Sequence, residues 1–349
     1  MSKGFVVRAP TRNYYPPSRL RRVTKKNVCS VCGKPDWCSV TEDGAMALCM
    51  RVAAGSLRQA QNGAHIHILR PTWIDSVPAV SAPPIGRCGN AEVKRAGADH
   101  LHKVYSFLLE ECLELRPEHG DHLLVERGLG DTVIASKLYA SAPSKSNLPS
   151  VCEKMRGRFG DALLGVPGFY RDSRGVVLMP SYRGIFIPIR DERGRIVGLQ
   201  CRSDGNGQAK YTWFSTNPDI YVSGTSSGTP VHYSKPDLVE RRGKALLIEG
   251  ALKADIVSEH LNMATVAVAG VSSFNADTFG ADIQRSLPQL RDAMIAFDAD
   301  WRTNEQVRGG LLRLIRSFKA AGLTIQGRVW DAERGKGLDD VLLNSDRSS

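Results

Sequence analysis

The strongest constraint on the fold lies in the last third of the chain, where short apolar runs alternate with stretches of helical pattern. The apolar runs are ALLIE, ATVAVAG, DAMIAFD and TIQGRVW, and the stretches between them include ALKADIVSEHL and GLLRLIRSFKAAG. Strands that alternate with helices in this way form a parallel sheet covered on both faces. The sequence therefore predicts an α/β domain over residues 239–349.

Carboxylates stand at or just beyond the ends of three of these predicted strands. Glu249 ends the first strand, Asp298 and Asp300 follow the third, and Asp339 and Asp340 lie at the start of the last helix. Ligands of an open parallel sheet bind at the carboxyl ends of its strands, so we expect these side chains to meet. Gathered carboxylates repel one another unless a hard cation neutralises them, and Mg²⁺ takes oxygen ligands. The pattern therefore predicts a Mg²⁺ or Mn²⁺ site of the kind that supports nucleotidyl transfer.

The middle of the chain, residues 97–238, carries mixed helix and strand signals. Apolar residues recur at helical spacing over residues 97–116. The segment 183–202, RGIFIPIRDERGRIVGLQCR, alternates apolar and polar residues on both sides of Asp191–Gly194. Such alternation around a charged, glycine-containing centre predicts a β-hairpin.

Four of the eight cysteines crowd into a short amino-terminal segment, with the spacing Cys29-x2-Cys32-x5-Cys38-x10-Cys49. A Cys-x2-Cys pair followed by glycine can place two thiolates at adjacent corners of a tetrahedron. In a reducing compartment this clustering indicates a metal rather than disulfides. We expect Zn²⁺ on all four cysteines, with His65 or His67 as an alternative to one of them.

The charge of the chain favours a polyanionic partner. It has 47 Lys and Arg against 36 Asp and Glu, a formal net charge of +11, which promotes binding through counterion release and field steering. Residues 1–27 hold eight basic residues and no acidic ones, which predicts a flexible arm that contacts phosphates or acts as a solubilising tail. The zinc module is expected over 28–70 and a Pro-rich linker over 71–96.

Nothing in the sequence predicts membrane insertion or export. The longest apolar run, Met263 to Val271, is far shorter than the ~20 residues of a membrane span. The amino-terminal residues MSKGFVVRAP lack an apolar stretch of signal-peptide length. We therefore expect a cytoplasmic protein with no membrane partner.

The carboxyl-terminal pattern resembles the Toprim domain. In that family Glu followed by Gly after a first strand precedes Asp-x-Asp after a third, as Glu249-Gly250 and Asp298-x-Asp300 do here. The resemblance covers roughly residues 240–345. Toprim domains occur in DnaG-type primases, topoisomerases, a family of nucleases and recombination mediators, so this pattern alone does not choose among those activities.

Two upstream segments resemble DnaG-type primases specifically. The hairpin of 183–202 is similar to one in the RNA-polymerase core of that family, with Arg202 at its arginine and Lys210-Tyr211 at its Lys-Tyr pair. The segment 123–143, which contains VERGL, resembles the family's Arg-Gly-Leu motif, with Arg127 at the basic position. The stretch CSVCGKPDWC and GVPGFY at 165–170 look most like primases of phages, plasmids and integrative elements.

The resemblance implies roles for particular residues. It implies that the catalytic residues are Glu249, Asp298 and Asp300. It also implies that these three and Asp340 bind Mg²⁺ or Mn²⁺. Arg127, Arg202 and Lys210 become contacts to template or nucleotide phosphates, since Arg grips phosphate bidentately and Lys supplies a point charge. One departure concerns Ser223-Gly224, which stands where relatives often have Lys-Gly, and Lys235 is a candidate substitute.

The sequence as a whole predicts a multi-domain α/β and α+β protein. Its parts are a zinc-ribbon-like module, a DnaG-type polymerase core with a mixed N-lobe over 97–238, and a Toprim domain over 239–349. The expected activity is synthesis of short RNA primers on single-stranded DNA from nucleoside triphosphates for a mobile element, beside a separate replicative helicase. A Toprim nuclease or topoisomerase-related enzyme, and a non-catalytic single-strand-binding protein of replication or recombination, remain as alternatives.

Overall fold

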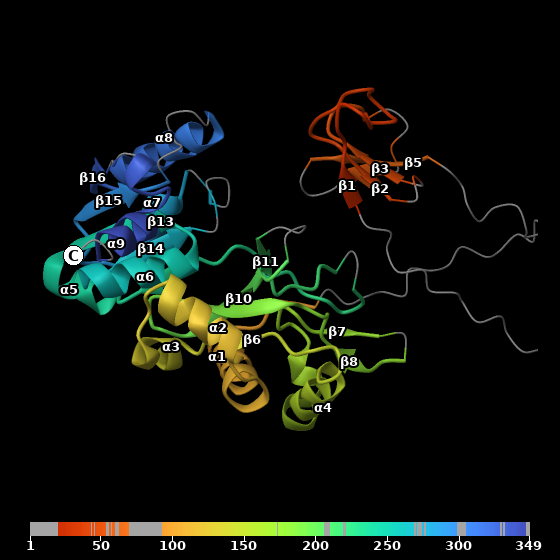
Figure 1. Ribbon diagram of the computed structural model, residues 1–349, viewed down its shortest axis with the longest axis horizontal. Helices are drawn as coiled ribbons and strands as arrows, with labels where there is room; N and C mark the ends of the chain where they lie inside the picture. The colour runs from red at the N-terminus through yellow and green to blue at the C-terminus, as the bar shows by residue number, and fades with distance from the viewer. Residues whose placement is uncertain are drawn as a thin grey trace, which may run out of the picture. The chain divides into compact units, whose positions relative to one another are not determined.

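The computed structural model divides into two compact units, Met1–Gly86 and Arg87–Ser349 (Figure 1). The structure describes residues 20–42, 44, 46–53, 56, 58–59, 63–69, 93–172, 174–205, 210–218, 221–268, 270, 274–275, 277–298, 305–328, 330 and 332–346. Most of the predicted basic arm and most of the predicted linker, which end at residues 27 and 96, lie outside the described residues.

The amino-terminal unit is a small antiparallel sheet in the strand order β1-β2-β3-β5-β4. The strands are β1 Leu20–Arg22, β2 Ser39–Thr41, β3 Met46–Cys49, β4 Arg58–Gln59 and β5 His65–Ile68. Its described core consists of Val23, Cys29, Cys38, Val40, Ala47 and Cys49. A core of this size seldom supports a fold alone, and half of its members are predicted metal ligands, so we expect the unit to depend on metal for its stability.

The amino-terminal half of the second unit contains a four-stranded antiparallel sheet in the order β11-β10-β9-β6. The strands are β6 Ala140–Ser141, β9 Gly184–Arg190, β10 Ile196–Ser203 and β11 Tyr211–Trp213. Strands β9 and β10 form the predicted hairpin. At its turn the Asp191 carboxylate accepts hydrogen bonds from the backbone N–H groups of Arg193 and Arg195 at 3.0 and 2.9 Å, which fixes the reversal of the chain.

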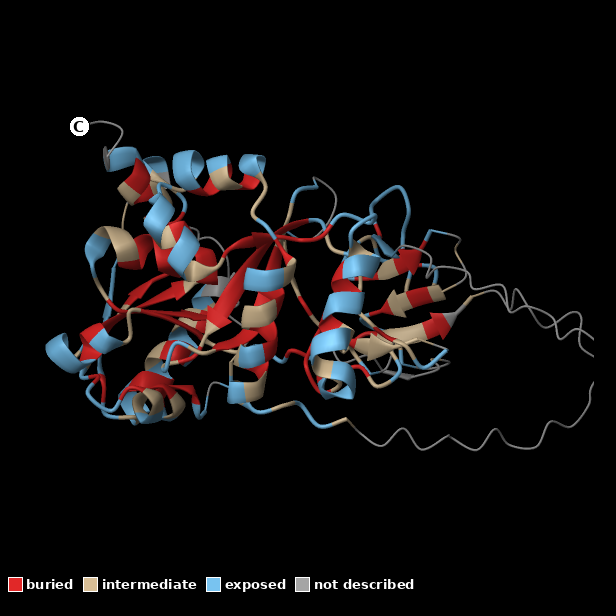
Figure 2. Cartoon of the chain, turned by 90° about the horizontal axis from the view of Figure 1, so that it is seen from below, coloured by how far each residue is buried: buried red, intermediate tan, exposed pale blue. Residues whose placement is uncertain are grey.

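Helices and short strands surround this sheet. The helix expected over 97–116 is shorter than predicted, because α1 passes at Leu108 into a π-helical turn that ends at Cys112. The elements are α1 Ala98–Phe107, α2 Pro117–Asp121, a π-helical turn His122–Glu126, α3 Asp131–Lys137, α4 Leu148–Phe159, a 3-10 turn Gly160–Leu163, β7 Tyr170–Arg171 and β8 Val177–Leu178. Large buried side chains such as Tyr105, Phe186 and Phe214 fill the space between them. In Figure 2 much of the central strands is red, the colour of buried residues.

The carboxyl-terminal half contains the predicted parallel sheet. Five described strands lie in the order β12-β14-β13-β15-β16, with β14, β13, β15 and β16 parallel and β12 antiparallel at the edge. The elements are β12 His232–Ser234, α5 Asp237–Arg242, β13 Lys244–Glu249, α6 Ala251–Leu261, β14 Thr265–Val268, α7 Phe279–Ser286, β15 Asp292–Ala296, α8 Glu305–Ala320, β16 Thr324–Gly327, a 3-10 turn Ala332–Arg334 and α9 Leu338–Asp346. Strand β12 lies upstream of residue 239, where the sequence pattern placed the start of the domain.

Helices cover both faces of this sheet because the strand residues alternate between two cores. Leu246 and Ile248 of β13 point to the face that carries α6 and Leu338 of α9. Leu247, between them, points to the face that carries Phe279 of α7 and residues of α8. The α/β architecture that the sequence predicted is therefore confirmed.

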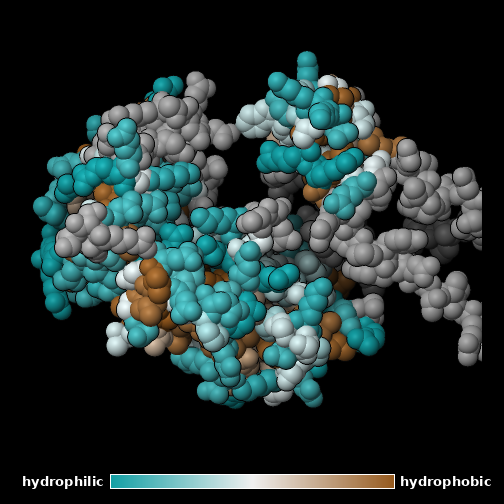
Figure 3. All heavy atoms as spheres, in the orientation of Figure 1, coloured by the Kyte–Doolittle hydropathy of each residue, from teal (hydrophilic) through white to brown (hydrophobic). Residues whose placement is uncertain are grey.

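The two halves of the second unit differ in the hydropathy of the surface seen in one view. In Figure 3 the face over the carboxyl-terminal sheet is mostly hydrophilic, and hydrophobic areas gather over the amino-terminal half. In the described part of the chain no helix has both the length and the apolar character needed to cross a bilayer.

Helix α6 joins the two halves through a buried carboxylate. Asp255 is 1% exposed and accepts hydrogen bonds from Lys137 at 2.6 Å and from Tyr139 at 2.7 Å, both in the amino-terminal half. On the other side it accepts a bond from Ser234 of β12 at 2.7 Å and lies 3.2 Å from Nε2 of His232. Burial acts to raise the pKa of Asp255, but His232, Lys137 and these hydrogen bonds hold it well below its ordinary value.

We predict that Asp255→Ala lowers the free energy of unfolding by about 3–5 kcal/mol, because Lys137, whose side chain is 14% exposed, loses its carboxylate partner. The stabilisation from this depressed pKa is present at neutral pH and is lost as pH falls below about 4, the pKa of an unfolded aspartate. Urea unfolding followed by circular dichroism at several pH values measures both effects. Asp282→Ala, which removes an exposed pair with Arg285, is the control and should cost at most about 1 kcal/mol. Equal effects of the two substitutions would contradict the prediction.

Candidate active site and zinc centre

A cavity of about 260 Å³ lies at the carboxyl ends of β13 and β15, where the two halves of the second unit meet. The carboxyl-terminal half contributes Glu249, the last residue of β13, and Asp298, which follows β15. The complete lining is Arg127, Gln200, Lys210, Tyr211, Glu249, Gly250, Leu252, Lys253, Asp298, Lys336, Asp339 and Asp340. The cavity thus brings together acidic and basic side chains from segments far apart in the sequence.

Most of the site residues predicted from the sequence meet in this cavity. The residues it gathers are Glu249, Asp298, Asp340, Arg127 and Lys210. Arg202 does not line it but lies beside it, since its Cα is paired with that of the lining residue Tyr211 between β10 and β11. Asp300 lies outside the described residues.

Two charged residues of the lining, Lys253 and Lys336, are absent from the site predicted from the sequence. The sequence predicts Asp339 among the gathered carboxylates without assigning it as a ligand. Lys336 and Asp339 belong to the stretch GKGLDD, from which only Asp340 was assigned a role. Lys253 lies in the first turn of α6, four residues after Glu249. A residue at this spacing, in the first turn of a helix, points its side chain back toward the end of the strand. The sequence could therefore have predicted that Lys253 lies in the site.

Asp298 is held by two lysines. Its Oδ1 lies 2.5 Å from Nζ of Lys253, and its Oδ2 lies 3.7 Å from Nζ of Lys336. Burial acts to lower the pKa of Lys253, but the hydrogen bond and charge of Asp298 raise it above its usual value. Lys253 is therefore a fully charged ammonium group among carboxylates.

Asp339 is the most deeply buried carboxylate of the site, and Arg127 is its partner. Nη1 of Arg127 lies 3.4 Å from Oδ2 of Asp339 and 3.9 Å from Oδ1 of Asp340. Gly128 allows this approach, since a Cβ there would lie 2.6 Å from Leu343 of α9. In the Arg-Gly pair of the sequence, Arg127 thus supplies the charge, and Gly128 leaves the space that α9 needs in order to pack there.

Asp339 also supplies an unsatisfied oxygen. Its side chain is 1% exposed, and Oδ1 is buried without a hydrogen-bond partner. Burial raises the pKa of Asp339, and the charges of Lys253 and Arg127 oppose that shift. A buried carboxylate oxygen without a partner is suited to a cation. The donor set of this pocket, which consists of carboxylate oxygens, therefore fits Mg²⁺ or Mn²⁺, with Asp339 as a candidate ligand beside Asp298 and Asp340.

The wall that the amino-terminal half contributes carries the cations Arg127 and Lys210. Burial lowers the pKa of Lys210, and the neighbouring charges of Arg127, Arg202 and Lys253 lower it further. Nε of both Arg127 and Arg202 is buried without a hydrogen-bond partner. Crowded, incompletely paired cations attract anions, so this wall is suited to phosphate groups. Lys235, the candidate substitute for an expected phosphate contact, instead pairs with Glu259 at 2.7 Å.

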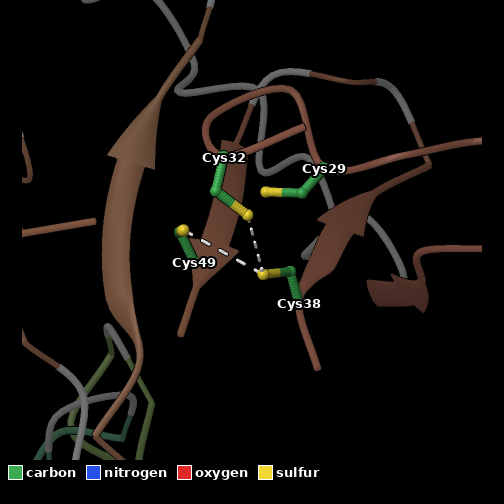
Figure 4. A group of neighbouring side chains, drawn as sticks. All are labelled: Cys29, Cys32, Cys38 and Cys49. Atoms are coloured by element: carbon green, nitrogen blue, oxygen red, sulfur yellow. Dashed lines mark hydrogen bonds between the residues drawn. The ribbon is translucent and has the colours of Figure 1, made fainter. Parts of the chain in front are cut away.

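The four predicted zinc ligands come together in the amino-terminal unit. Figure 4 shows the side chains of Cys29, Cys32, Cys38 and Cys49 converging, and their Sγ atoms all lie within 4.8 Å of one another. The Cys32–Cys38 and Cys38–Cys49 sulfur distances are 3.7 and 4.0 Å. Four thiolates at Zn–S distances near 2.3 Å in a tetrahedron are separated by roughly 3.8 Å. The cluster therefore has the geometry of a Cys₄ zinc site.

Burial and hydrogen bonds from the backbone act in opposite directions on the pKa values of Cys32 and Cys38. At Cys38 burial, together with the neighbouring thiols, raises the pKa to about 12. Backbone N–H groups of Met50 and Val52 donate to Sγ of Cys38 and Cys49, each at 3.4 Å. Burial acts to raise the pKa of Cys32, but the backbone of Lys34 and the neighbouring thiols lower it to about 7. A thiolate is thus available at neutral pH to begin metal binding.

The alternative histidine ligands do not join the cluster. His67 is buried, and its Nε2 lies 2.8 Å from the backbone oxygen of Val52. Among the described residues, the group of ligating side chains gathered around one point consists of the four cysteines and excludes His65 and His67. The structure therefore favours the all-cysteine set.

Comparison with known proteins identifies the fold. A family model described as a domain of unknown function (DUF3854) matches residues 244–348. No curated protein sequence matches the chain. The chain is similar to the zinc-binding and RNA polymerase domains of Aquifex aeolicus primase, at 17% identity and a TM-score of 0.55 over 72% of this chain and 61% of that one. This chain has a DnaG-type primase fold.

Two further structures support this fold. The RNA polymerase domain of Mycobacterium tuberculosis primase DnaG matches at 16% identity and a TM-score of 0.53, over 70% of this chain and 78% of that one. A DnaG primase catalytic domain bound to single-stranded DNA matches at 20% identity and a TM-score of 0.50, over 71% and 75%. The chain spans about three fifths of the Aquifex aeolicus structure, and identities this low establish the fold alone.

We predict that the purified protein contains about one Zn²⁺ per chain and that Cys32→Ser or Cys38→Ser loses it. Metal analysis measures the content, and Co²⁺ substitution adds a sulfur-to-metal absorption band that reports thiolate ligation. Cys112→Ser, which changes a half-buried cysteine outside the cluster, should keep both signals. Wild-type protein without zinc, or equal loss in all three variants, would contradict the assignment.

Proposed function

We propose that this protein is a DNA primase that synthesises short RNA primers on single-stranded DNA by metal-dependent nucleotidyl transfer. The observation that carries the proposal is the cavity that places carboxylates beside Arg127 and Lys210 within a DnaG-type fold. A primase must hold a template and nucleoside triphosphates, all anionic, beside a divalent cation. A cavity lined by both carboxylates and cationic side chains meets both requirements.

The carboxylates of the cavity support the chemical step. A bound Mg²⁺ or Mn²⁺ would activate the attacking 3′-hydroxyl and orient the triphosphate. We assign Asp298, Asp300, Asp339 and Asp340 to holding it, and Glu249 to accepting the proton of the hydroxyl. The strand order and the Glu249-Gly250 turn support the interpretation of residues 239–349 as a Toprim domain.

The cationic side chains and the zinc module would contact the nucleic acid. We assign Arg127, Arg202 and Lys210 to phosphates of the template or of the incoming nucleotide. One structural neighbour is a primase bound to single-stranded DNA, which supports a single-stranded template for this chain as well. In the zinc module Trp37 is 56% exposed, and an exposed indole can stack on a base where synthesis starts.

The biological setting is proposed from the sequence resemblance. Residues 29–38 and 165–170 resemble primases of phages, plasmids and integrative elements. We therefore infer a role in replication of a mobile element, in the cytoplasm and beside a separate replicative helicase.

A non-catalytic single-strand-binding protein is the second candidate, because Lys253 and Lys336 already neutralise Asp298. A protein that only binds DNA would keep the cationic side chains and have no use for the carboxylates. A Toprim nuclease is distinguished in the same assay, because it shortens DNA and makes no primer.

We predict that Glu249→Gln and Asp298→Asn each reduce primer synthesis at least about 100-fold and leave single-strand binding largely intact, because they remove metal-linked carboxylates and no phosphate contact. The protein is incubated with single-stranded DNA, labelled nucleoside triphosphates and Mg²⁺ or Mn²⁺, and the products are resolved by size. Asp292→Asn, at the opposite end of β15 from the cavity, is the matched control and should retain activity. Near-normal synthesis by both site variants would exclude the assigned chemistry.

We also predict that Arg202→Ala and Lys210→Ala each lower the slope of log affinity against log salt for single-stranded DNA by about 0.7–1, the value for one phosphate contact. Fluorescence anisotropy across a salt series measures the slope. Arg285→Ala removes an exposed cation on α7 that pairs with Asp282 and should leave the slope unchanged. Wild-type slopes and primer yields in both site variants would show that these residues do not contact phosphate.

A further inference from the structure

Lys253 occupies an unusual position for a lysine. It lies in the first turn of α6, whose neighbouring residues Leu252 and Ala254 are buried in apolar cores. Its side chain is 25% exposed and lines the cavity rather than reaching into solvent. A lysine in such a place pays the cost of desolvation unless nearby carboxylates stabilise its charge.

The carboxylates that stabilise it converge at one point of the cavity. Gly337 marks that point, since a Cβ there would lie 3.0 Å from Nζ of Lys253, 3.3 Å from Oδ1 of Asp298 and 2.3 Å from Oδ1 of Asp339. The absence of a side chain at residue 337 therefore leaves room for one ammonium group and two carboxylates. The charges of Asp339 and Glu249 also act on Lys253, together with that of Asp298.

The described residues that line the cavity include equal numbers of carboxylates and cationic side chains, so their formal charges cancel without any added ion. Its carboxylates are Glu249, Asp298, Asp339 and Asp340, and its cationic side chains are Arg127, Lys210, Lys253 and Lys336. Lys253 is the cation with the shortest distance to a carboxylate, 2.5 Å, and Lys336 is 67% exposed at 3.7 Å. At 2.5 Å, the ammonium group of Lys253 lies where an ion bound to Asp298 Oδ1 would have to approach.

We propose that Lys253 is a cation built into this cavity, which holds Asp298 and Asp339 in place without metal and competes with a divalent cation for their oxygens. The inference rests on the proposed function, because it concerns the metal site assigned there. It implies that the unliganded protein binds Mg²⁺ or Mn²⁺ weakly. It also implies that the phosphates of a bound nucleotide, which attract both the lysine and the metal, would free the carboxylates for the metal.

The first test measures Mn²⁺ binding to the full, zinc-loaded protein without nucleotide, from the electron paramagnetic resonance signal of free Mn²⁺. Lys253→Met should bind Mn²⁺ about ten-fold more tightly than wild type or better, because the competing charge is gone. Lys253→Arg keeps the charge and should bind as weakly as wild type. Lys244→Met, at the amino end of β13 and 55% exposed, is the matched control and should leave the affinity unchanged.

The second test measures thermal unfolding without added divalent cation. Lys253→Met should melt at a lower temperature than wild type, because the carboxylates then repel one another, and Mn²⁺ should restore it. The melting temperature of wild type should respond little to Mn²⁺. Affinity of Lys253→Met within about two-fold of wild type, absence of Mn²⁺ binding in every variant, or a wild-type protein that needs Mn²⁺ for its melting temperature would each overturn the proposal.

These measurements separate the inference from the proposed function. Neither depends on primer synthesis, so tighter Mn²⁺ binding by Lys253→Met in a protein that makes no primers would support the built-in cation and reject the primase. Conversely, primer synthesis by wild type with unchanged Mn²⁺ affinity in Lys253→Met would support the primase and reject the built-in cation.

Discussion

The candidate active site depends on helix α6 and the buried carboxylate of Asp255. This helix packs on the parallel sheet and also contributes Ala251, Leu252 and Ile256 to the core of the amino-terminal half. Asp255 accepts hydrogen bonds from Lys137 and Tyr139 on one side and from Ser234 on the other. Because a buried charge needs its partners, this network fixes the two halves against each other, and the cavity between them keeps its shape.

The chemistry of that cavity follows from opposing charges held close together. Strand ends and the start of α9 supply the carboxylates, and Arg127 and Lys210 come from the other half. Burial lowers the pKa of Lys210 and raises that of Asp339, and neighbouring like charges add to both shifts. Both shifts mark buried charged groups that a bound ligand of opposite charge would stabilise.

The cysteine cluster of the amino-terminal unit also gathers groups whose charged forms a bound cation would stabilise. Three of the six buried apolar residues of its described core are cysteines, Cys29, Cys38 and Cys49. Their sulfurs, with that of Cys32, approach one another closely enough to repel as thiolates, so that a metal would supply both the missing charge and much of the stability. A metal ion would neutralise the thiolates of the cluster, whereas in the cavity Lys253 and Lys336 already neutralise Asp298.

The sequence by itself determined the elements and the ligands that lie close together in the chain. Alternating apolar runs predicted the parallel sheet, period-2 alternation predicted the β9–β10 hairpin, and the cysteine spacing predicted a cluster that the structure contains. These features depend on local periodicity, which a sequence displays directly. Only the tertiary structure decided that Lys253 neutralises Asp298, that Arg127 pairs with Asp339 more than 200 residues away, and that His65 and His67 stay outside the cysteine cluster. Such pairings depend on how the elements pack in space, because burial decides which charges must find partners, and no local pattern records it.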